Sequence, residues 1–311
     1  MRRFRPILLS SDSLQVETIP ELGAKISSMK MMPSGAELLQ QPLRPYAERS
    51  HTMAFDESDA SGFDECLPTV AGCEYPSAAG RVAVPDHGDF WRIPFSSEPV
   101  GNTLTLQATG FSLPLKFKKK LTLEKNELRI DYSVCNAGTT PTEFAWSAHP
   151  LFRVDAGDRV LLPPSSGKVT VEGSGKERLG KAGHEYSWPL AKLDDGTTVD
   201  LSRCGGAGDE TGDKLYLPAP HEGWCAIERT HLKVRVEVRF DAEVTPYLGL
   251  WLCYGGWPLQ QANRQQCVAL EPCTAPVDSL AIAAENGKAK KLAPQAEFEW
   301  SISIRVLPQQ A

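Results

Sequence analysis

The sequence lacks the long apolar run that a membrane-spanning helix requires. No stretch of its 311 residues approaches the roughly 20 consecutive apolar residues that cross a bilayer. The N-terminus begins with basic residues, but the apolar run from Ile7 to Leu9 is far shorter than the 7 to 15 residues or so of a secretory signal. We therefore expect a cytoplasmic protein with no membrane partner.

The sequence also has fewer basic residues than acidic ones. Lysine and arginine together number 33 against 39 aspartates and glutamates, which gives a formal net charge of −6 and a pI near 5.6. Nucleic-acid-binding surfaces need clustered Lys and Arg, so no nucleic-acid partner is expected. The one basic run, Lys118-Lys119-Lys120, lies within an alternating pattern, and we interpret it as the solvent face of a strand. A hydrophobic fraction of 41% argues against disorder.

Cysteine pairs of the CxxC kind are absent. The eight cysteines are spread over a long chain, with neither a zinc-ribbon spacing nor the density of a disulfide scaffold. We expect buried free thiols and no structural metal.

Amphipathic helices are missing from the pattern as well, because no long segment carries an apolar stripe of helical period. The dominant period is two. Leu115 to Leu123 alternates, Glu124-Lys125-Asn126-Glu127 turns the chain, and Leu128 to Val134 alternates again, which predicts a hairpin. Leu232–Phe240 and Phe298–Val306 repeat this alternation. The shorter strand candidates are Leu14–Ile19, Ala24–Met31, Thr103–Thr109, Phe144–Phe152 and Tyr247–Tyr254.

Turn residues separate these strands, and no obvious linker divides the chain. We predict an all-β fold, an antiparallel sandwich or barrel, in one domain covering residues 1–311. Leu190–Leu193 and Val277–Ala284 would form short turns at most, and the segment from Gly173 to Gly212 would form surface loops.

Three ionisable residues stand in unusual settings. His87 lies between Pro85 and Gly88 with aromatic and charged neighbours, and a glycine beside it permits close approach of a ligand to the backbone. His149 shares one face of an apolar strand with Ser147, which suggests a lined cavity. Glu271 follows buried strand residues, so its carboxylate must be paired, hydrogen-bonded or functional. Each alone could still be structural.

The segments that contain these residues resemble the aldose 1-epimerase (galactose mutarotase-like) family. Asp86-His87-Gly88, Ala148-His149-Pro150-Leu151-Phe152 and Leu270-Glu271-Pro272-Cys273-Thr274 occur in the order and approximate spacing of that family. Leu292-Ala293-Pro294 is similar to its closing turn. The resemblance covers most of the chain and implies a large antiparallel β-sandwich, the galactose mutarotase-like supersandwich.

The resemblance also implies roles for single residues. His149 would be the general acid, Glu271 the general base and His87 a sugar-binding histidine, with neither metal nor other cofactor. Asp213 would match a sugar-binding aspartate. The family's arginine upstream of the first histidine has no counterpart in Phe63-Asp64-Glu65-Cys66.

Several residues could complete a sugar site in place of that arginine. Arg81 or Arg92 could replace it, and Asp64 and Glu65 could accept hydrogen bonds from sugar hydroxyls. Sugar C–H faces pack on aromatic rings, so at least one ring of a set of four is expected to border the cleft. These rings are Trp91, Phe152, Trp251 and Tyr254.

The leading interpretation is an epimerase of free aldoses, a monomer or homodimer whose partner is a small-molecule sugar. A hexose-6-phosphate epimerase on the same scaffold would need a Lys or Arg cluster at the pocket. A non-catalytic carbohydrate-binding protein is a third interpretation. A metal site of His87, His149 and Glu271 is disfavoured because the two histidines are far apart in sequence, and a serine hydrolase lacks its Gly-x-Ser-x-Gly elbow.

Overall fold

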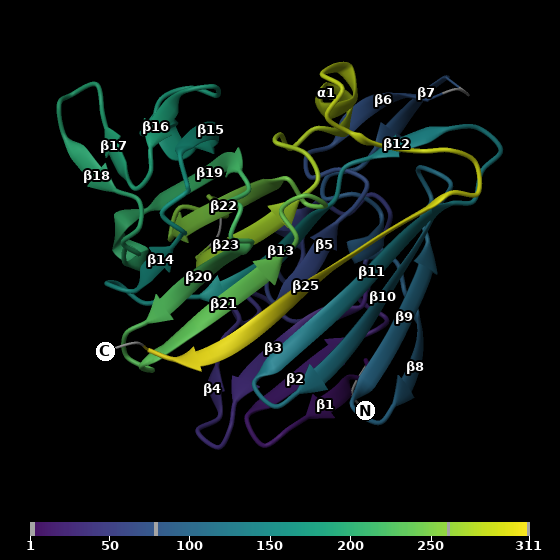
Figure 1. The fold of residues 1–311 in the computed structure, drawn as a ribbon, viewed down its shortest axis with the longest axis horizontal. Coiled ribbons are helices and arrows are strands. Elements are labelled where there is room, and N and C mark those ends of the chain that lie inside the picture. The colour runs from purple at the N-terminus through teal and green to yellow at the C-terminus, as the bar shows by residue number, and fades with distance from the viewer. Residues whose placement is uncertain (1–3, 78–79, 260–261, 310–311) are drawn as a thin grey trace.

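Two large antiparallel sheets contain most of the regular structure (Figure 1). The computed structural model describes residues 4–77, 80–259 and 262–309. Over these residues, the larger sheet has 13 strands. In spatial order it contains β1 (Ile7–Ser10), β2 (Leu14–Ile19), β3 (Lys25–Met31), β5 (Phe63–Cys66), β13 (Ser147–Arg153), β23 (Gln266–Cys273), β22 (Tyr247–Tyr254), β19 (Thr211–Pro218), β15 (Lys168–Ser174), β16 (Glu185–Ser187), β17 (Leu190–Lys192) and β18 (Thr198–Asp200), with β4 (Ala36–Glu37) paired to β3.

The smaller sheet has eight strands over the same described residues. Its order is β14 (Arg159–Leu161), β20 (Trp224–Arg229), β21 (Val234–Phe240), β25 (Glu297–Pro308), β11 (Glu127–Asn136), β10 (Leu115–Glu124), β9 (Thr103–Thr109) and β8 (Ser96–Val100). In Figure 1 the yellow β25 crosses this sheet between the green β21 and the teal β11.

Short elements connect and cover the sheets. They are the strand pairs β6 (Cys73–Ser77) with β7 (Gly80–Val84) and β12 (Thr142–Phe144) with β24 (Lys290–Leu292), the 3-10 turns η1 (Phe55–Glu57), η2 (Phe90–Arg92), η3 (Gly175–Glu177) and η4 (Ala207–Asp209), and the helix α1 (Leu280–Glu285). Among the described residues, no helix has the length and apolar character needed to cross a membrane.

The strands that period-two alternation predicts, such as β10 and β11, are present in the structure. The burial of β10 alternates along its whole length, and its hairpin with β11 pairs Leu115 with Asn136 and Glu124 with Glu127. Lys125 turns this hairpin in the left-handed region, at φ 50°. The predicted all-β sandwich of antiparallel sheets is confirmed.

Three predictions about local structure need correction. The expected strand Phe144–Phe152 is divided between β12 and β13, and Leu190–Leu193 contributes the strand β17 instead of a turn. The expected loops from Gly173 to Gly212 contain the edge strands β16, β17 and β18. These strands are three residues long, too short for an alternating pattern to show in the sequence.

The larger sheet is buried on both faces at its centre. Leu250 and Leu270 point into the core between the sheets, where they join Leu121 and Ile302 of the smaller sheet in one apolar cluster. The residues that alternate with them point the other way. There Leu151, Cys253, Cys267 and Ala269 form a separate cluster with Trp251 and Trp257. All eight cysteines lie in the described part of the chain as free thiols, and six are buried.

Lys119 corrects the interpretation of the basic run. Lys118 and Lys120 are exposed as expected, but Lys119 is fully buried because the alternation of β10 points it into the core. Its Nζ atom donates to both carboxylate oxygens of Glu65, at 2.9 and 3.1 Å, and Tyr132 donates to the same carboxylate at 3.1 Å. Burial raises the pKa of Glu65, and Lys119 opposes that shift.

Breaking this pair should destabilise the fold. Lys119→Met leaves the Glu65 carboxylate buried without its counter-charge, and we expect a loss of about 3–5 kcal/mol in the free energy of unfolding. Lys118→Met, on the exposed face of the same strand, should change it by no more than about 0.5 kcal/mol. Adding Glu65→Leu to Lys119→Met should restore most of the loss. Urea denaturation of the wild type, the two lysine variants and the double variant measures the free energy of unfolding. Equal stabilities of Lys119→Met and Lys118→Met would contradict the prediction.

Candidate functional site

A cavity of about 270 Å³ lies on the face of the larger sheet that points away from the sandwich core. Its volume is near the lower end for small-molecule pockets, which suits a compact ligand. It is lined by Phe55, Asp56, Val70, Asp86, His87, His149, Lys214, Trp251, Trp257, Gln265, Glu271 and Asp278. The three ionisable residues singled out in the sequence therefore share one cavity.

Strand register places His149 beside Glu271. Strands β13 and β23 pair Ser147 with Cys273 and Leu151 with Ala269, so His149 stands opposite Glu271. On the other side of Glu271, β22 contributes Gly249. Residues directly opposite in an antiparallel pair share a face of the sheet, and these three positions therefore form one row across the floor of the cavity.

Glu271 is completely buried, and its two carboxylate oxygens have different surroundings. Oε2 accepts a hydrogen bond from Ser147 Oγ at 3.1 Å and another from Lys214 Nζ. Oε1 has no hydrogen-bond partner among the described residues and lies 4.0 Å from His149 Nε2. Burial raises the pKa of Glu271 above its ordinary value, and the Lys214 ammonium opposes that shift.

Lys214 reaches Glu271 from a strand that is not adjacent to it. It belongs to β19, and β22 runs between β19 and β23. Gly249 of β22 leaves the space for this contact, because a Cβ atom there would lie 2.9 Å from Glu271 Oε2. Burial lowers the pKa of Lys214, but the carboxylates of Glu271 and Asp278 raise it above its ordinary value.

Sequence reasoning missed Lys214 and selected its neighbour. Lys214 and Asp213 are consecutive on β19 and therefore point to opposite faces of the sheet. Asp213 is fully buried on the other face, where Arg178 Nε donates to Oδ2 at 2.9 Å and Ser174 donates to Oδ1 at 2.6 Å. The structure thus does not bring Asp213 into the cavity. Because Asp213 and Lys214 are consecutive on a strand, the sequence did indicate that only one of these two charged residues could face the cavity.

The two histidines approach each other at the cavity wall. The ring centroids of His87 and His149 are 5.3 Å apart, at an angle of 79°. His87 stacks on Phe55 at 3.9 Å, and its Nδ1 atom lies 3.0 Å from Asp86 Oδ2. His149 is only 6% exposed, and burial, followed by electrostatic interaction with His87 and Lys214, lowers its pKa well below the ordinary value.

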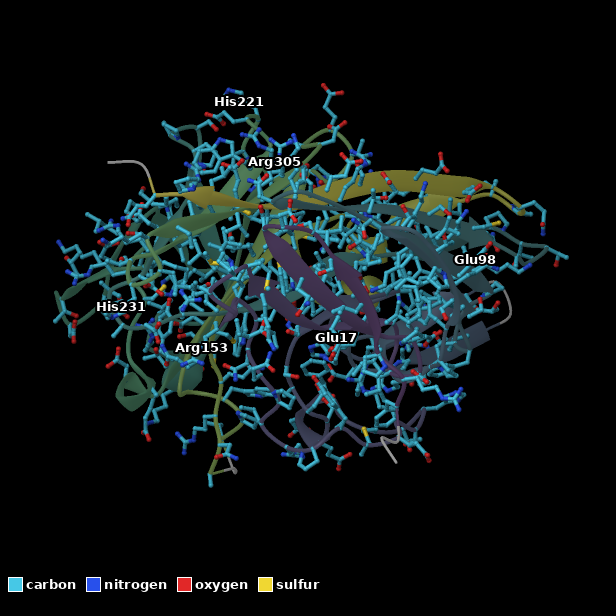
Figure 2. All side chains as sticks on the ribbon, turned by 90° about the horizontal axis from the view of Figure 1, so that it is seen from below. Glu17, Glu98, Arg153, His221, His231 and Arg305 are labelled. Atoms are coloured by element: carbon cyan, nitrogen blue, oxygen red, sulfur yellow. The ribbon has the colours of Figure 1, made fainter. Side chains whose placement is uncertain are left out.

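The other histidines of the chain lie elsewhere. His51, His184, His221 and His231 are all exposed, and Figure 2 shows His221 and His231 at the periphery of the molecule.

Trp91 and Arg92 hold the segment that carries His87 without lining the cavity. His87 has a left-handed backbone, φ 58°, and Gly88 follows at φ 70°, where a side chain would collide with the carbonyl of Leu67. Arg92 is 4% exposed, and its Nη1 atom donates to the carbonyl of Asp86 at 2.7 Å. Trp91 is 1% exposed and donates to the same carbonyl at 3.2 Å. Both residues therefore act on His87 through its backbone.

Asp64 and Glu65 also lie outside the cavity lining. Asp64 is buried against Lys25 and Arg49, and Glu65 faces the sandwich core with Lys119. Their oxygens are occupied by internal cations and are therefore not presented to a ligand. Arg81, the other candidate for the missing arginine, lies on the hairpin of β6 and β7, which forms a different hollow.

Aromatic rings line the cavity, but they are mostly not the ones expected. Trp251 borders it, whereas Trp91, Phe152 and Tyr254 are buried away from it. Phe55, from the short 3-10 turn η1, and Trp257, from an irregular segment, take their place, and no periodic pattern points to either. Trp251 is oriented by a 2.9 Å hydrogen bond from its Nε1 atom to Gln265.

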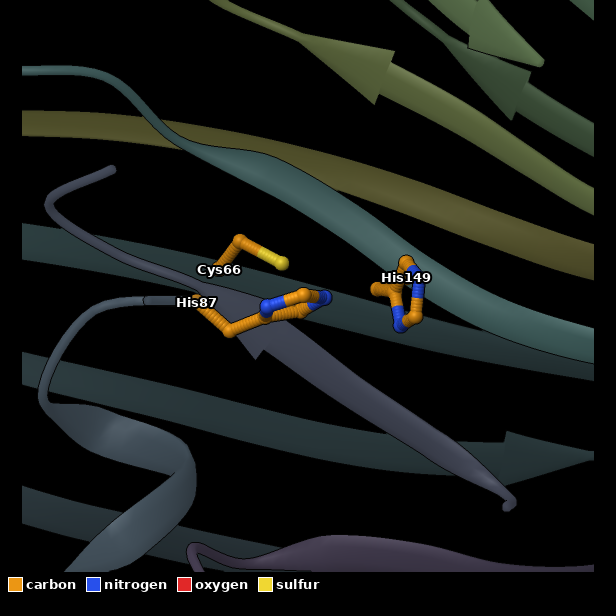
Figure 3. A group of neighbouring side chains, drawn as sticks. All are labelled: Cys66, His87 and His149. Carbon is orange, nitrogen blue, oxygen red and sulfur yellow. The ribbon is translucent and has the colours of Figure 1, made fainter. Parts of the chain in front are cut away.

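Cys66 adds a thiol next to the two histidines. One ligating atom from each of Cys66, His87 and His149 lies within 4.8 Å of the others (Figure 3). These residues could hold a metal ion, although their separation in sequence gave no such indication.

No known family model matches the sequence, and no curated protein matches it. Solved structures do match. The Slr1438 protein from Synechocystis sp. PCC 6803 superposes with a TM-score of 0.72 at 16% identity, over 99% of this chain and 97% of that one. A galactose mutarotase related enzyme from Lactobacillus acidophilus gives 0.69 at 17% identity over 98% of each chain. The chain has the galactose mutarotase-like fold.

A third match agrees with this assignment. A candidate aldose 1-epimerase from Escherichia coli K12 gives a TM-score of 0.71 at 18% identity, over 98% of this chain and 99% of that one. The galactose mutarotase-like architecture expected from the sequence motifs is thus confirmed over the full length. Similarity at these identities concerns the fold, and the chemistry depends on the residues of the cavity.

Proposed function

We propose that the protein is an aldose 1-epimerase-like enzyme that interconverts the anomers of a free sugar by acid–base ring opening. The observation that carries this proposal is the unpartnered Oε1 atom of Glu271, 4.0 Å from His149 Nε2 at the wall of a small cavity. A buried carboxylate oxygen without a hydrogen-bond donor is costly in a merely structural role. A sugar hydroxyl would supply that donor.

The reaction needs two proton transfers and no net change in atoms. Glu271 takes the proton of the C1 hydroxyl while His149 delivers one to the ring oxygen, and the C1–O5 bond breaks to give the open-chain aldehyde. Rotation about the C1–C2 bond presents the other face of the carbonyl. Reclosure then returns both protons by the reverse transfers. Positioned acids and bases each contribute about 10²–10⁴-fold to such reactions.

The remaining lining residues supply groups that suit a sugar. Phe55, Trp251 and Trp257 offer apolar faces for the C–H patches of the ring. His87, Gln265 and Asp278 present polar groups to its hydroxyls. His87 is therefore assigned to binding and His149 and Glu271 to proton transfer.

Free aldoses should be better substrates than their 6-phosphates. Among the described residues, four carboxyl groups line the cavity: those of Asp56, Asp86, Glu271 and Asp278. The one lysine in this lining, Lys214, is paired with Glu271. A phosphate of charge near −2 would meet like charges there. In polarimetric assays, kcat/KM should favour a free aldose over its 6-phosphate by at least about tenfold, or 1.4 kcal/mol.

The same assay separates the alternatives. Faster turnover of a 6-phosphate would favour the hexose-6-phosphate epimerase interpretation. Saturable binding of a sugar with no gain over its spontaneous anomerisation would favour a non-catalytic carbohydrate-binding protein.

Removing either proton-transfer group should abolish most turnover. Glu271→Gln removes the basic oxygen and His149→Asn removes the proton donor, and each should lower kcat by at least about 10²-fold with a smaller effect on sugar affinity. The double variant should be little worse than either single one, because both act in one step. Polarimetry on the best substrate of the panel measures kcat.

Exposed residues of the same types provide the controls. Glu98→Gln on β8 and His221→Asn, at a side chain that is 81% exposed, should both retain wild-type kcat. Thermal unfolding verifies that each variant is folded. Near wild-type anomerisation by Glu271→Gln would show that another group is the base.

The pH dependence of kcat/KM should be bell-shaped, with its maximum below pH 6.5. Activity requires ionised Glu271, so it falls as the pH drops through a pKa raised above 4.5. It also requires protonated His149, so it falls as the pH rises through a pKa lowered well below 6.5. Initial rates corrected for spontaneous anomerisation between pH 4 and 9 or so test this. A rate that stays constant up to pH 8 or so would contradict His149 as the acid.

A further inference from the structure

Ring opening assigns no task to Cys66, yet its thiol lies beside the two histidines of the cavity. One ligating atom of each residue lies within 4.8 Å of the other two. Figure 3 shows the Cys66 sulfur and the His87 ring both directed toward His149. Cys66 is 1% exposed, so this thiol lies at the inner end of the cavity, behind the histidines that line it.

The fold fixes this arrangement through two backbone contacts. Cys66 ends β5 and stands opposite Ser147 of β13, two residues before His149, so the thiol and the imidazole share a face of the sheet. The next residue, Leu67, forms a parallel bridge with Gly88. That bridge joins the His87 segment to the end of β5, and the pairing of β5 with β13 joins His149 to Cys66. The three side chains cannot separate unless one of these backbone contacts breaks.

The chemistry of the three groups matches a soft divalent cation. One cysteine and two histidines form a ligand set that suits Zn²⁺, and three protein ligands leave a coordination position open. With Zn–S near 2.3 Å and Zn–N near 2.0–2.1 Å, the ligand atoms of a tetrahedral site with one sulfur and two nitrogens are about 3.3–3.6 Å apart. Because the three ligand atoms lie within 4.8 Å of one another, binding requires a contraction of at most about 1.5 Å, within the reach of small side-chain rotations.

The surroundings of the histidines also fit a metal. His149 is 6% exposed, and its Nδ1 atom has no hydrogen-bond partner among the described residues. The Nδ1 atom of His87 lies 3.0 Å from the Asp86 carboxylate without a well-aligned hydrogen bond, a contact that a small rotation of the ring would turn into one, which leaves Nε2 for a ligand. Metal-bound histidines commonly have a carboxylate at the second ring nitrogen, where it fixes the tautomer and orientation of the ring.

We infer that Cys66, His87 and His149 bind a Zn²⁺ ion at the inner end of the cavity. The ion excludes the sugar reaction, because it occupies the imidazole that delivers the proton and the one that binds the sugar. This inhibition rests on the proposed function, whereas binding of the ion does not.

Cobalt titration of the metal-free full-length protein tests the ligand set. Co²⁺ should bind one ion per chain, with a thiolate-to-cobalt absorption band that added Zn²⁺ removes. Cys66→Ser should lose the band, whereas Cys135→Ser, at a half-buried cysteine on β11 of the smaller sheet, should keep it. Asp86→Asn should weaken Co²⁺ binding by about 10–100-fold. His87→Asn gives a second ligand variant at a partly exposed position, should Cys66→Ser fail to fold.

The outcomes distinguish this inference from the proposed function. A Co²⁺ spectrum without a thiolate band, or one that survives Cys66→Ser, would overturn the site whether or not the protein turns over any sugar. If the protein anomerises a sugar, Zn²⁺ should inhibit it, and the concentration for half-inhibition should rise at least tenfold in Cys66→Ser. Full activity with Zn²⁺ bound would overturn the inhibition.

Discussion

Burying the Glu271 carboxylate in the middle of a sheet requires a counter-charge, and Lys214 supplies it across the intervening strand. Neither residue would be stable there alone, because an unpaired buried charge costs several kcal/mol. Their contact depends in turn on Gly249, whose missing side chain leaves room beside Glu271 Oε2. The pair of Glu271 and Lys214 can therefore form only when the three strands β19, β22 and β23 are in register.

Alternation along the strands separates two buried ion pairs with different consequences. Glu65 points into the sandwich core, where Lys119 and Tyr132 satisfy its carboxylate, and nothing remains for a ligand. Glu271 points to the opposite face, where the donors reach only one of its oxygens. The number of hydrogen-bond partners thus distinguishes Glu65, whose carboxylate joins the two sheets, from Glu271, which has one oxygen left for a ligand.

The sequence predicts the strands and singles out three of the residues that line the cavity because both signals are local. Period-two alternation is visible within β10, β11 and β21, and His87, His149 and Glu271 stand out against their immediate neighbours. The partners of these residues are not local. The phase of the alternation puts Lys119 on the apolar face of β10, but it does not show that Glu65 of the other sheet is its partner.

The same limit explains the other differences. A shift of one residue on β19 exchanges Asp213 for Lys214 at the cavity, because adjacent side chains point to opposite faces. Phe55 comes from a three-residue 3-10 turn and Trp257 from an irregular segment, and the course of both depends on tertiary contacts rather than on any repeat in the sequence. Cys66 and His87 become neighbours only through the bridge between Leu67 and Gly88.

A shared fold at 16% to 18% identity fixes the path of the backbone and leaves the cavity to a few positions. Where the family resemblance leads us to expect an arginine, this chain has a buried segment whose Asp64 is already neutralised by Lys25 and Arg49. The cation nearest Glu271 comes instead from Lys214, on the opposite side of Glu271 from His149. Under the proposed function, ring opening would take place beside a lysine rather than the arginine that the resemblance implies, and the choice of sugar would follow from this exchange of partners.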